Sequence, residues 1–206
     1  MKKNDFLLIG LICFAPLVLF AGENGFNYYI NTGIAKAMAT SEFKASYRSG
    51  VHVNIGVGKA FKSQLEGMFN LSFNHLTFDG RGFQSTFDGN NSDQLIVNGG
   101  PCGMLDALAG VKYRLGSGES TRAVSYVSIQ GGIQHRTTHR ITIYNPDADY
   151  DQIFASESMT HPLLNMGLGA EFTVENTTLF AELAFDVGFE NDDNNVTSLL
   201  KFGLKL

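Results

Sequence analysis

The stretch that decides the fold is LFAELAFDVGFE, residues Leu179–Glu190, in which apolar side chains alternate with polar or small ones. One set of alternate positions is apolar and includes Leu183, whereas the other carries the carboxylates of Glu182, Asp186 and Glu190. A β-strand directs alternate side chains to opposite faces of its sheet, so this segment predicts a strand with one apolar and one charged face. Which face looks towards the interior decides the class of protein.

Seven further segments alternate with the same period of two. They are residues 26–38, 47–58, 65–78, 105–115, a segment that starts near residue 123, 163–174, and 196–206. Those with two defined ends run for 11 to 14 residues. A tilted strand needs about 9–11 residues to cross the hydrocarbon core of a bilayer, whereas a typical globular strand has about five or six. The strand lengths therefore favour a membrane-spanning sheet.

The connections between these segments differ in length in a regular way. Those after the second, fourth and sixth segments are short, reading KAFKSQ, GSGEST and ENTT. Those after the third and fifth are long, Asp79–Gly103 and Arg136–His161, and the remaining two are intermediate. Short turns at one end and longer loops at the other are typical of outer-membrane barrels. The pattern predicts an all-β fold, an eight-stranded antiparallel up-and-down transmembrane β-barrel with short periplasmic turns and longer extracellular loops.

The less apolar faces of the eight segments carry glycines, amides and a balanced set of charges. In a barrel this face lines a narrow lumen, where large side chains find little room and buried charges must be paired. Six charged residues fall in the periplasmic half of the predicted barrel, and we expect them to form an ion network in the lumen: Glu66, Lys112, Arg114, Glu171, Glu182 and Lys201. An eight-stranded barrel filled in this way is not expected to conduct bulk solutes.

The apolar faces should then meet lipid, with aromatic residues near the two membrane interfaces. The sequence places such residues at both ends of the segments. We expect Tyr28, Tyr113, Phe172 and Phe202 at the periplasmic interface, and Tyr47 and Phe189 at the outer one.

The first 21 residues, MKKNDFLLIGLICFAPLVLFA, have the features of a secretory signal peptide. Two lysines precede an apolar run from Phe6 to Phe20, and a small residue, Ala21, ends it. The run is shorter than the roughly 20 residues of a spanning helix and contains Pro16. We therefore predict that residues 1–21 are cleaved, that residues 22–206 form the barrel, and that the protein is exported to the outer membrane of a Gram-negative bacterium.

Charge and cysteine content exclude several classes of function. The chain carries 15 Lys and Arg against 20 Asp and Glu, a net charge of −5, which is the wrong sign for a nucleic-acid-binding protein. Of its two cysteines, Cys13 lies in the predicted signal peptide, so Cys102 is left alone and can form neither an internal disulfide nor a zinc cluster. We predict no cofactor and no metal site.

Basic residues gather where the fifth segment leaves the membrane. The motif QHRTTHR places His135 and His139 on one face and Arg136 and Arg140 on the other. These four are candidates for contacts with lipopolysaccharide phosphates or with the loops, and a metal site is a further interpretation. The alternative is a basic loop stem that pairs with loop acids.

Two other motifs carry little chemistry. Asp147, Asp149 and Asp151 have the spacing of a calcium loop, but its glycine and its twelfth-position glutamate are missing, so we interpret them as a solvated loop tip.

No histidine is followed two positions later by a serine, and Cys102 has no evident activating base. We therefore expect no catalytic residue and no enzymatic activity. The alternatives are a barrel enzyme that acts on lipid A or phospholipid, and a soluble periplasmic lipocalin-like barrel whose apolar face points inward.

Three motifs support a family resemblance over residues 26–206. They are GVGKAF and LAGVKYRL ahead of short turns, and the terminal alternating segment LLKFGLKL. With the spacing of the eight segments, the chain resembles the small outer-membrane β-barrels that include the OmpA membrane domain, OmpX and the opacity-type surface proteins. The resemblance implies a barrel scaffold whose surface loops serve adhesion, host interaction or envelope integrity. It also implies that the partners are outer-membrane lipid, lipopolysaccharide, the barrel-assembly machinery and host surface molecules.

Overall fold

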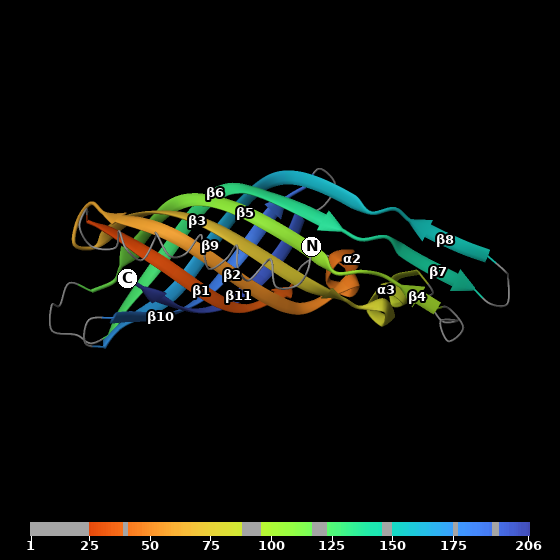
Figure 1. The fold of residues 1–206 in the computed structure, drawn as a ribbon, viewed down its shortest axis with the longest axis horizontal. Coiled ribbons are helices and arrows are strands. Elements are labelled where there is room, and N and C mark those ends of the chain that lie inside the picture. Colours follow the sequence, from red (N-terminus) through yellow and green to blue (C-terminus); the bar gives the residue numbers. More distant parts are fainter. Residues whose placement is uncertain are drawn as a thin grey trace, which may run out of the picture.

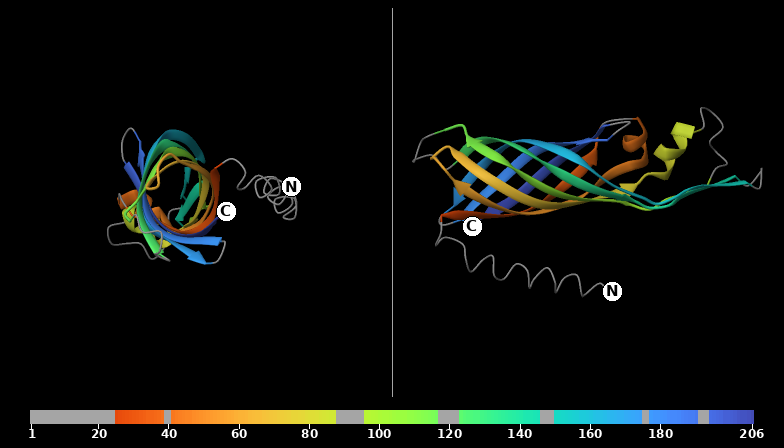
Figure 2. Two further views of the ribbon diagram at one scale, coloured as in Figure 1. Left: turned by 90° about the vertical axis from the view of Figure 1, so that its left-hand side faces the viewer. Right: turned by 90° about the horizontal axis from the view of Figure 1, so that it is seen from above.

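The structure, a computed structural model, describes residues 25–38, 41–87, 96–116, 123–145, 150–174, 177–190 and 194–206. The predicted signal peptide and residues 147–149 of the acidic motif lie outside these ranges. Eight long strands form a closed antiparallel barrel in the order β1-β11-β10-β9-β6-β5-β3-β2 (Figures 1 and 2). They are β1 (Phe26–Ala37), β2 (Tyr47–Ala60), β3 (Leu65–Phe78), β5 (Cys102–Arg114), β6 (Ala123–Thr138), β9 (Glu157–Val174), β10 (Thr177–Phe189) and β11 (Asn194–Lys205). The predicted eight-stranded antiparallel fold is confirmed.

The first and last strands close the barrel. Ile30 of β1 lies opposite Ile55 of β2 and also opposite Leu204 of β11, so β1 is paired along both of its edges. The end-on view in Figure 2 shows the continuous ring of strands that results. Lipid cannot hydrogen-bond a free strand edge, and closure removes every such edge from the barrel wall.

Exposure settles the question that the alternating strands raised. Leu183 and Leu168 on the outer face are 47% and 56% exposed, whereas Glu66 and Asp106 on the inner face are 0% exposed. Apolar side chains thus cover the outside of the barrel, and charged or amide side chains fill its interior. A soluble lipid-binding barrel needs the opposite arrangement. The pattern of exposed apolar and buried polar side chains in the barrel strands therefore agrees with the prediction that the apolar faces meet lipid.

The aromatic residues follow the predicted distribution with one exception. Tyr113, Phe172, Phe189 and Phe202 are exposed on the outer face, near the ends of their strands, and Tyr28 is half-buried. The placement of Tyr47 at the outer interface was wrong, because its side chain is buried. The register between β2 and β3 shifts between Tyr47 and Gly50, and this irregularity breaks the alternation on which the prediction rested.

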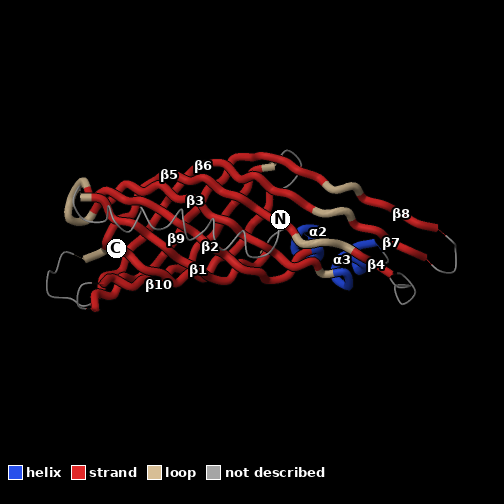
Figure 3. Tube along the Cα trace, in the orientation of Figure 1, coloured by secondary structure: helices blue, strands red, loops and turns tan. Residues whose placement is uncertain are grey.

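The two long connections are more structured than the sequence suggested. Segment 79–103 contains α3 (Gly80–Phe87) and β4 (Ile96–Asn98), and α2 (Ser41–Ser46) lies in a shorter connection. In segment 136–161, β6 continues to Thr138 and β9 starts at Glu157, with β7 (Ile141–Asn145) and β8 (Tyr150–Phe154) between them. Strands β4, β7 and β8 form a separate three-stranded sheet beyond the barrel (Figures 1 and 3). No helix among the described residues is long and apolar enough to span a membrane.

A small apolar core explains why this outer sheet forms. Ile141 and Ile143 of β7 are buried with Phe83 of α3, and Val97 and Phe154 pack against them. Alternating apolar residues in β7 therefore bury one face against α3 rather than remaining solvated as a loop would. Residues 79–103 and 136–161 are the long connections that the sequence predicted, and in addition they contain a helix and strands that the sequence did not indicate. We call α3 with β4, β7 and β8 the outer sheet unit.

A second apolar cluster lies inside the outer end of the barrel. Cys102 and Met104, both fully buried, pack there with Tyr47 and with Phe43 of α2. The alternation had suggested an inner face that is polar along its whole length. At the outer end this face is apolar instead. Cys102 is a free cysteine in this cluster and serves as a small apolar side chain there.

Candidate functional site

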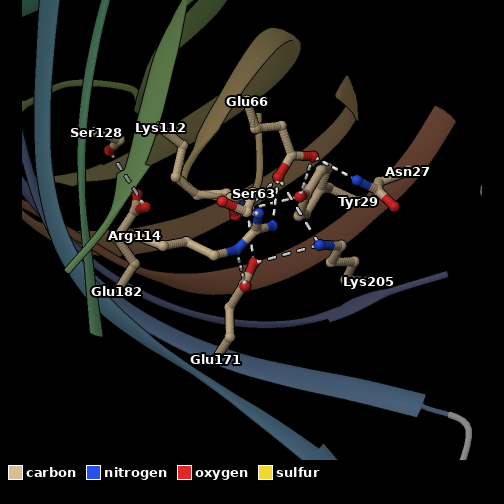
Figure 4. Close-up of polar contacts among 10 residues, drawn as sticks. All are labelled: Asn27, Tyr29, Ser63, Glu66, Lys112, Arg114, Ser128, Glu171, Glu182 and Lys205. Atoms are coloured by element: carbon tan, nitrogen blue, oxygen red, sulfur yellow. Dashed lines mark hydrogen bonds and ion pairs between the residues drawn. The ribbon is translucent and has the colours of Figure 1, made fainter. Parts of the chain in front are cut away.

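Four of the six predicted lumen charges meet at the periplasmic end of the barrel (Figure 4). Lys112 and Arg114 are two residues apart on β5 and therefore point to the same face. Arg114 lies 2.6 Å from Glu66 and 2.9 Å from Glu171, measured between nitrogen and oxygen atoms. Lys112 lies 3.3 Å and 2.6 Å from the same two carboxylates. Two acids and two bases from β3, β5 and β9 thus form one closed set of ion pairs.

Three residues join this set that the sequence analysis did not assign to it. The hydroxyl of Tyr29 donates to Glu66 over 2.6 Å, and the amide of Asn27 donates to the same carboxylate over 2.7 Å. Lys205 lies 3.8 Å from both Glu66 and Glu171. The sequence could have indicated two of them. Tyr29 lies two residues from Asn27 and Lys205 lies four residues from Lys201, so each points to the same face of its strand as that polar neighbour. We call these seven residues the lower ion cluster: Asn27, Tyr29, Glu66, Lys112, Arg114, Glu171 and Lys205.

The other two predicted charges form a separate pair. Glu182 and Lys201 are opposite one another on β10 and β11, and their charged groups are 2.8 Å apart. The hydroxyl of Ser128 also donates to Glu182 over 3.4 Å. Figure 4 shows this contact beside the lower ion cluster. Removing one partner of such a buried ion pair typically costs about 3–5 kcal/mol, because the remaining charge stays buried without compensation. All three glutamates are therefore committed to structural contacts and are not free to act as general acids or bases.

Glycines make room for these charges. A Cβ atom at position 58 would lie 2.3 Å from a carboxylate oxygen of Glu66, and one at position 169 would lie 2.5 Å from the ring of Tyr126. Gly58 and Gly169 therefore allow large side chains of neighbouring strands to fill the lumen at these heights.

A belt of amides crosses the middle of the lumen. Asn70 of β3 donates to Gln130 of β6 over 2.6 Å, and Gln130 donates to Asn165 of β9 over 3.5 Å. Asn165 in turn donates to Asp186 of β10 over 2.6 Å. One hydrogen-bonded chain thus links four strands around the interior.

A further polar layer lies towards the outer end. Asp106 accepts hydrogen bonds from Ser72, Asn74 and Gln134, with distances of 2.8–2.9 Å. His52 donates from Nδ1 to Asn74 over 2.7 Å. Asp106 is therefore satisfied by three neutral donors although it has no ion-pair partner among the described residues.

The four basic residues of QHRTTHR are not brought together. Arg136 points into the barrel, where it lies 2.9 Å from Glu190 and stacks over the ring of Phe43 at 5.6 Å. His139 donates to the carbonyl of Pro101 over 2.8 Å, and Arg140 is exposed. This geometry directs Arg136 away from lipid phosphates. It leaves His135, His139 and Arg140 accessible at the outer rim.

His135 lies on the outer face in a small cluster of hydroxyl groups. Its Nε2 is 3.0 Å from the hydroxyl of Ser158, and its Nδ1 is 2.8 Å from that of Thr160. No motif within one strand indicates this pair, because β9 supplies the serine. A catalytic histidine is normally oriented by a carboxylate that stabilises the imidazolium, whereas a threonine hydroxyl carries no charge. Among the described residues no group of three His, Cys, Asp or Glu is arranged to hold a metal.

Solved structures with similar folds are outer-membrane barrels. Neisserial surface protein A has a TM-score of 0.53 and 14% identity, over 90% of this chain and 98% of that one. Ail, the attachment invasion locus protein of Yersinia pestis, has a TM-score of 0.48 and 14% identity, over 87% and 98% of the two chains. The N-terminal β-barrel domain of Pseudomonas aeruginosa OprF has a TM-score of 0.43 and 16% identity, over 88% and 98%.

No protein-family profile and no curated protein sequence matches this chain significantly. At this level of identity the structural similarity establishes the fold alone, and it agrees with the closed eight-stranded topology and the apolar exterior. The chain therefore has the fold of the small eight-stranded outer-membrane β-barrels.

Proposed function

We propose that this chain is an integral outer-membrane protein whose barrel is a scaffold for structures displayed outside the cell. The observation that carries the proposal is the polarity of the barrel, with an apolar exterior and a charged interior. Such a wall is stable in lipid, which covers the apolar exterior, while the charges inside are paired with one another. In water the apolar exterior would remain exposed to solvent.

The outer sheet unit is the part that the scaffold displays. One face of its sheet packs on α3, whereas Ile96, Tyr144 and Ile153 are exposed. Recognition residues are often carried by connecting segments that a rigid frame holds in place. Adhesion, interaction with host surface molecules and support of envelope integrity are all compatible with this unit. Lipopolysaccharide and outer-membrane lipid are the expected neighbours of the barrel, and the barrel-assembly machinery is the expected partner of the chain during insertion.

The filled lumen supports a scaffold rather than a pore. The lower ion cluster occupies the periplasmic end, and the apolar cluster around Phe43 and Met104 occupies the outer end. Within the part of the chain that the structure describes, His135 of the Ser158–His135 pair has no charged partner, which favours a non-enzymatic function.

Cell fractionation tests the membrane assignment. We expect the protein in the outer-membrane fraction, and we expect unheated and heated samples to migrate differently on a detergent gel, because a closed barrel resists detergent until heated. A protein found in the soluble periplasmic fraction, without a heat-dependent shift, would exclude this assignment.

A truncation tests the scaffold assignment. Residues 139–156 can be replaced by a short Gly-Ser turn that joins β6 to β9, which removes β7 and β8 and leaves the barrel wall intact. We expect the heat-dependent shift to persist, and adhesion to host cells or resistance to envelope stress to fall to the level of the deletion strain. Full activity of the truncated barrel in both assays would contradict a role for the outer sheet unit. A change in lipid A, seen by mass spectrometry when the protein is expressed, would favour the enzyme alternative.

A further inference from the structure

The outer wall of the barrel carries a groove on its apolar face, across four neighbouring strands. Strands β11, β1, β2 and β3 follow one another in the wall (Figure 1). The groove has a volume of about 660 Å³, and its lining includes Ile30, Thr32, Ile55, Phe73 and Phe202. Sites for small molecules typically have a volume of about 300–1,000 Å³ and mostly apolar walls. We call this feature the wall groove.

Side-chain size along one row of residues explains the groove. The strand register places five outer-face residues side by side: Phe202, Thr32, Val53, Phe73 and Leu105. Two small side chains thus lie between two phenylalanines, which are 53% and 42% exposed. The hydroxyl of Thr32 donates to the backbone carbonyl of His52 over 3.0 Å, so this hydroxyl needs no further partner. The floor therefore offers methyl groups, and the two aromatic rings form the sides.

The surroundings of the wall groove restrict its occupant. In the membrane this face is covered by hydrocarbon, and a gap left beside it would lose van der Waals contacts along its whole lining. A flexible hydrocarbon chain can enter a groove between two rings, whereas a packed protein surface needs a matching ridge. The shape and polarity of the groove thus fit one acyl chain of a membrane lipid.

A lysine lies above the wall groove on the same strand. Lys36 is four residues from Thr32, or about 14 Å along β1 at about 3.4 Å per residue. Its neighbours Ala35 and Ala37 are buried, so the exposed side chain of Lys36 points to the outer face. A lysine on this face is costly within the hydrocarbon and tolerated at the interface. Lys36 therefore marks the level of the lipid headgroups.

The charge of Lys36 is not neutralised by the protein. Among the described residues no carboxylate lies within ion-pair distance of it, and its partners across the strands are Ser49 and Ser198. Arg48, next to Ser49, is paired with Asp79, so these two together add no net charge. One ammonium group is thus free to bind an anion at the end of the barrel that carries the outer sheet unit.

We propose that the wall groove holds an acyl chain of lipid A, the membrane anchor of lipopolysaccharide, and that Lys36 binds a phosphate of the same molecule. Lipid A combines acyl chains with phosphate groups and occupies the outer leaflet, the level at which Lys36 lies. The inference rests on the proposed function for the direction of the barrel, and it adds a specific bound lipid to that function. A phospholipid has the same two kinds of group, so the experiment must separate the two lipids.

Lipid titration tests the site. The mature barrel is refolded in nonionic detergent micelles and titrated with lipid A, and native mass spectrometry counts the bound molecules. A ligand that binds only the folded state also raises Tm as its concentration increases. We expect one tightly bound lipid A per barrel and a rising Tm. Lipid A without phosphates should bind about tenfold more weakly, because the charge-assisted contact with Lys36 is lost.

Two pairs of matched variants assign the effect to the site. Val53→Phe fills the groove, and we expect it to prevent lipid A binding, whereas Val127→Phe makes the same change on the outer face of β6, away from the groove. Lys36→Gln should weaken binding about tenfold, and Lys62→Gln removes an exposed lysine from the opposite end without effect. The heat-dependent shift on a detergent gel confirms that each variant is folded. If Val53→Phe does not fold, Lys36→Gln still tests the proposal, because it changes only an exposed side chain.

Three results would overturn the proposal. Unchanged binding in both Val53→Phe and Lys36→Gln would show that lipid A contacts the wall without a defined site. Equal binding of phosphatidylglycerol would show that any anionic lipid serves, although its phosphodiester carries less charge than a phosphate monoester. A dimer in the mass spectrum that Val53→Phe abolishes would show that a second copy covers the groove. None of these results alters the membrane assignment, which cell fractionation tests independently.

Discussion

Replacement of Leu183 by lysine tests which face of the barrel meets lipid. Leu183 is 47% exposed on the outer face, and its partners on the two neighbouring strands are Leu168 and Leu200, which are also exposed. It lies near the middle of the apolar outer face of β10, which runs from Leu179 to Phe189. A lysine at the bilayer midplane of a barrel costs about 2–4 kcal/mol. On a soluble surface the same substitution would be nearly neutral.

The matched control is Leu179→Lys on the same strand. Leu179 is four residues from Leu183, or about 14 Å along the strand at about 3.4 Å per residue. It therefore lies close to the periplasmic interface, where a lysine costs about 0–1 kcal/mol. We expect the free energy of unfolding to fall by about 2–3 kcal/mol more for Leu183→Lys than for Leu179→Lys.

The assay is reversible urea unfolding in phospholipid vesicles. The chain has no tryptophan, so the folded fraction is best read from the mobility of unheated samples on a detergent gel. A companion variant, Glu182→Leu, changes the adjacent residue on the inner face and leaves Lys201 without its partner at 2.8 Å, which should cost about 3–5 kcal/mol. If Leu183→Lys were no worse than Leu179→Lys and Glu182→Leu were stabilising, the assignment of the two faces would be refuted.

Three further outcomes are expected. Glu66→Gln should lower the free energy of unfolding by about 3–5 kcal/mol, because Lys112 and Arg114 must then share the single carboxylate of Glu171. Adding Arg114→Met removes one of these two bases and should restore part of the loss; full additivity in urea unfolding would contradict the cluster. Cys102 should resist maleimide in the folded barrel and react after urea unfolding, as followed by mass spectrometry; rapid labelling of the folded barrel would contradict its burial. The hydrogen bond from Arg48 holds the pKa of Asp79 below its usual value. This contact therefore stabilises the attachment of α3 at every pH above the ordinary carboxyl pKa. The stabilisation is lost as the pH falls through the lowered pKa of Asp79. Hydrogen exchange in α3 should therefore quicken in acid in the wild type, and an unchanged acid dependence in Asp79→Asn would assign the effect to another group.

Local pattern was sufficient wherever a strand lies in the barrel wall. Alternation depends on the side-chain period of two, which a strand obeys whatever its partners are. The inward placement of Glu66, Lys112, Arg114 and Glu171 could therefore be predicted from the sequence. That Arg114 bridges both carboxylates could not, because the contact depends on the register of β5 against β3 and on the tilt of β9.

Prediction failed where the wall ends. Tyr47 follows the alternation of β2 by count, but the register shift beside it turns its side chain inward. Arg136 and His135 belong to one short motif, yet they point to opposite sides of β6 and have unrelated partners. In the outer sheet unit, Ile141 and Ile143 are buried only because α3, which is distant in sequence, packs on them.

The sequence by itself determined the number of strands, their antiparallel succession and the polarity of their faces, because these depend on period, length and hydrophobicity along a single strand. Only the tertiary structure decided which charges pair and which connections fold into the outer sheet unit. Those features depend on distances between strands, and the closed barrel brings Arg114 to both Glu66 and Glu171, which are far apart in the chain.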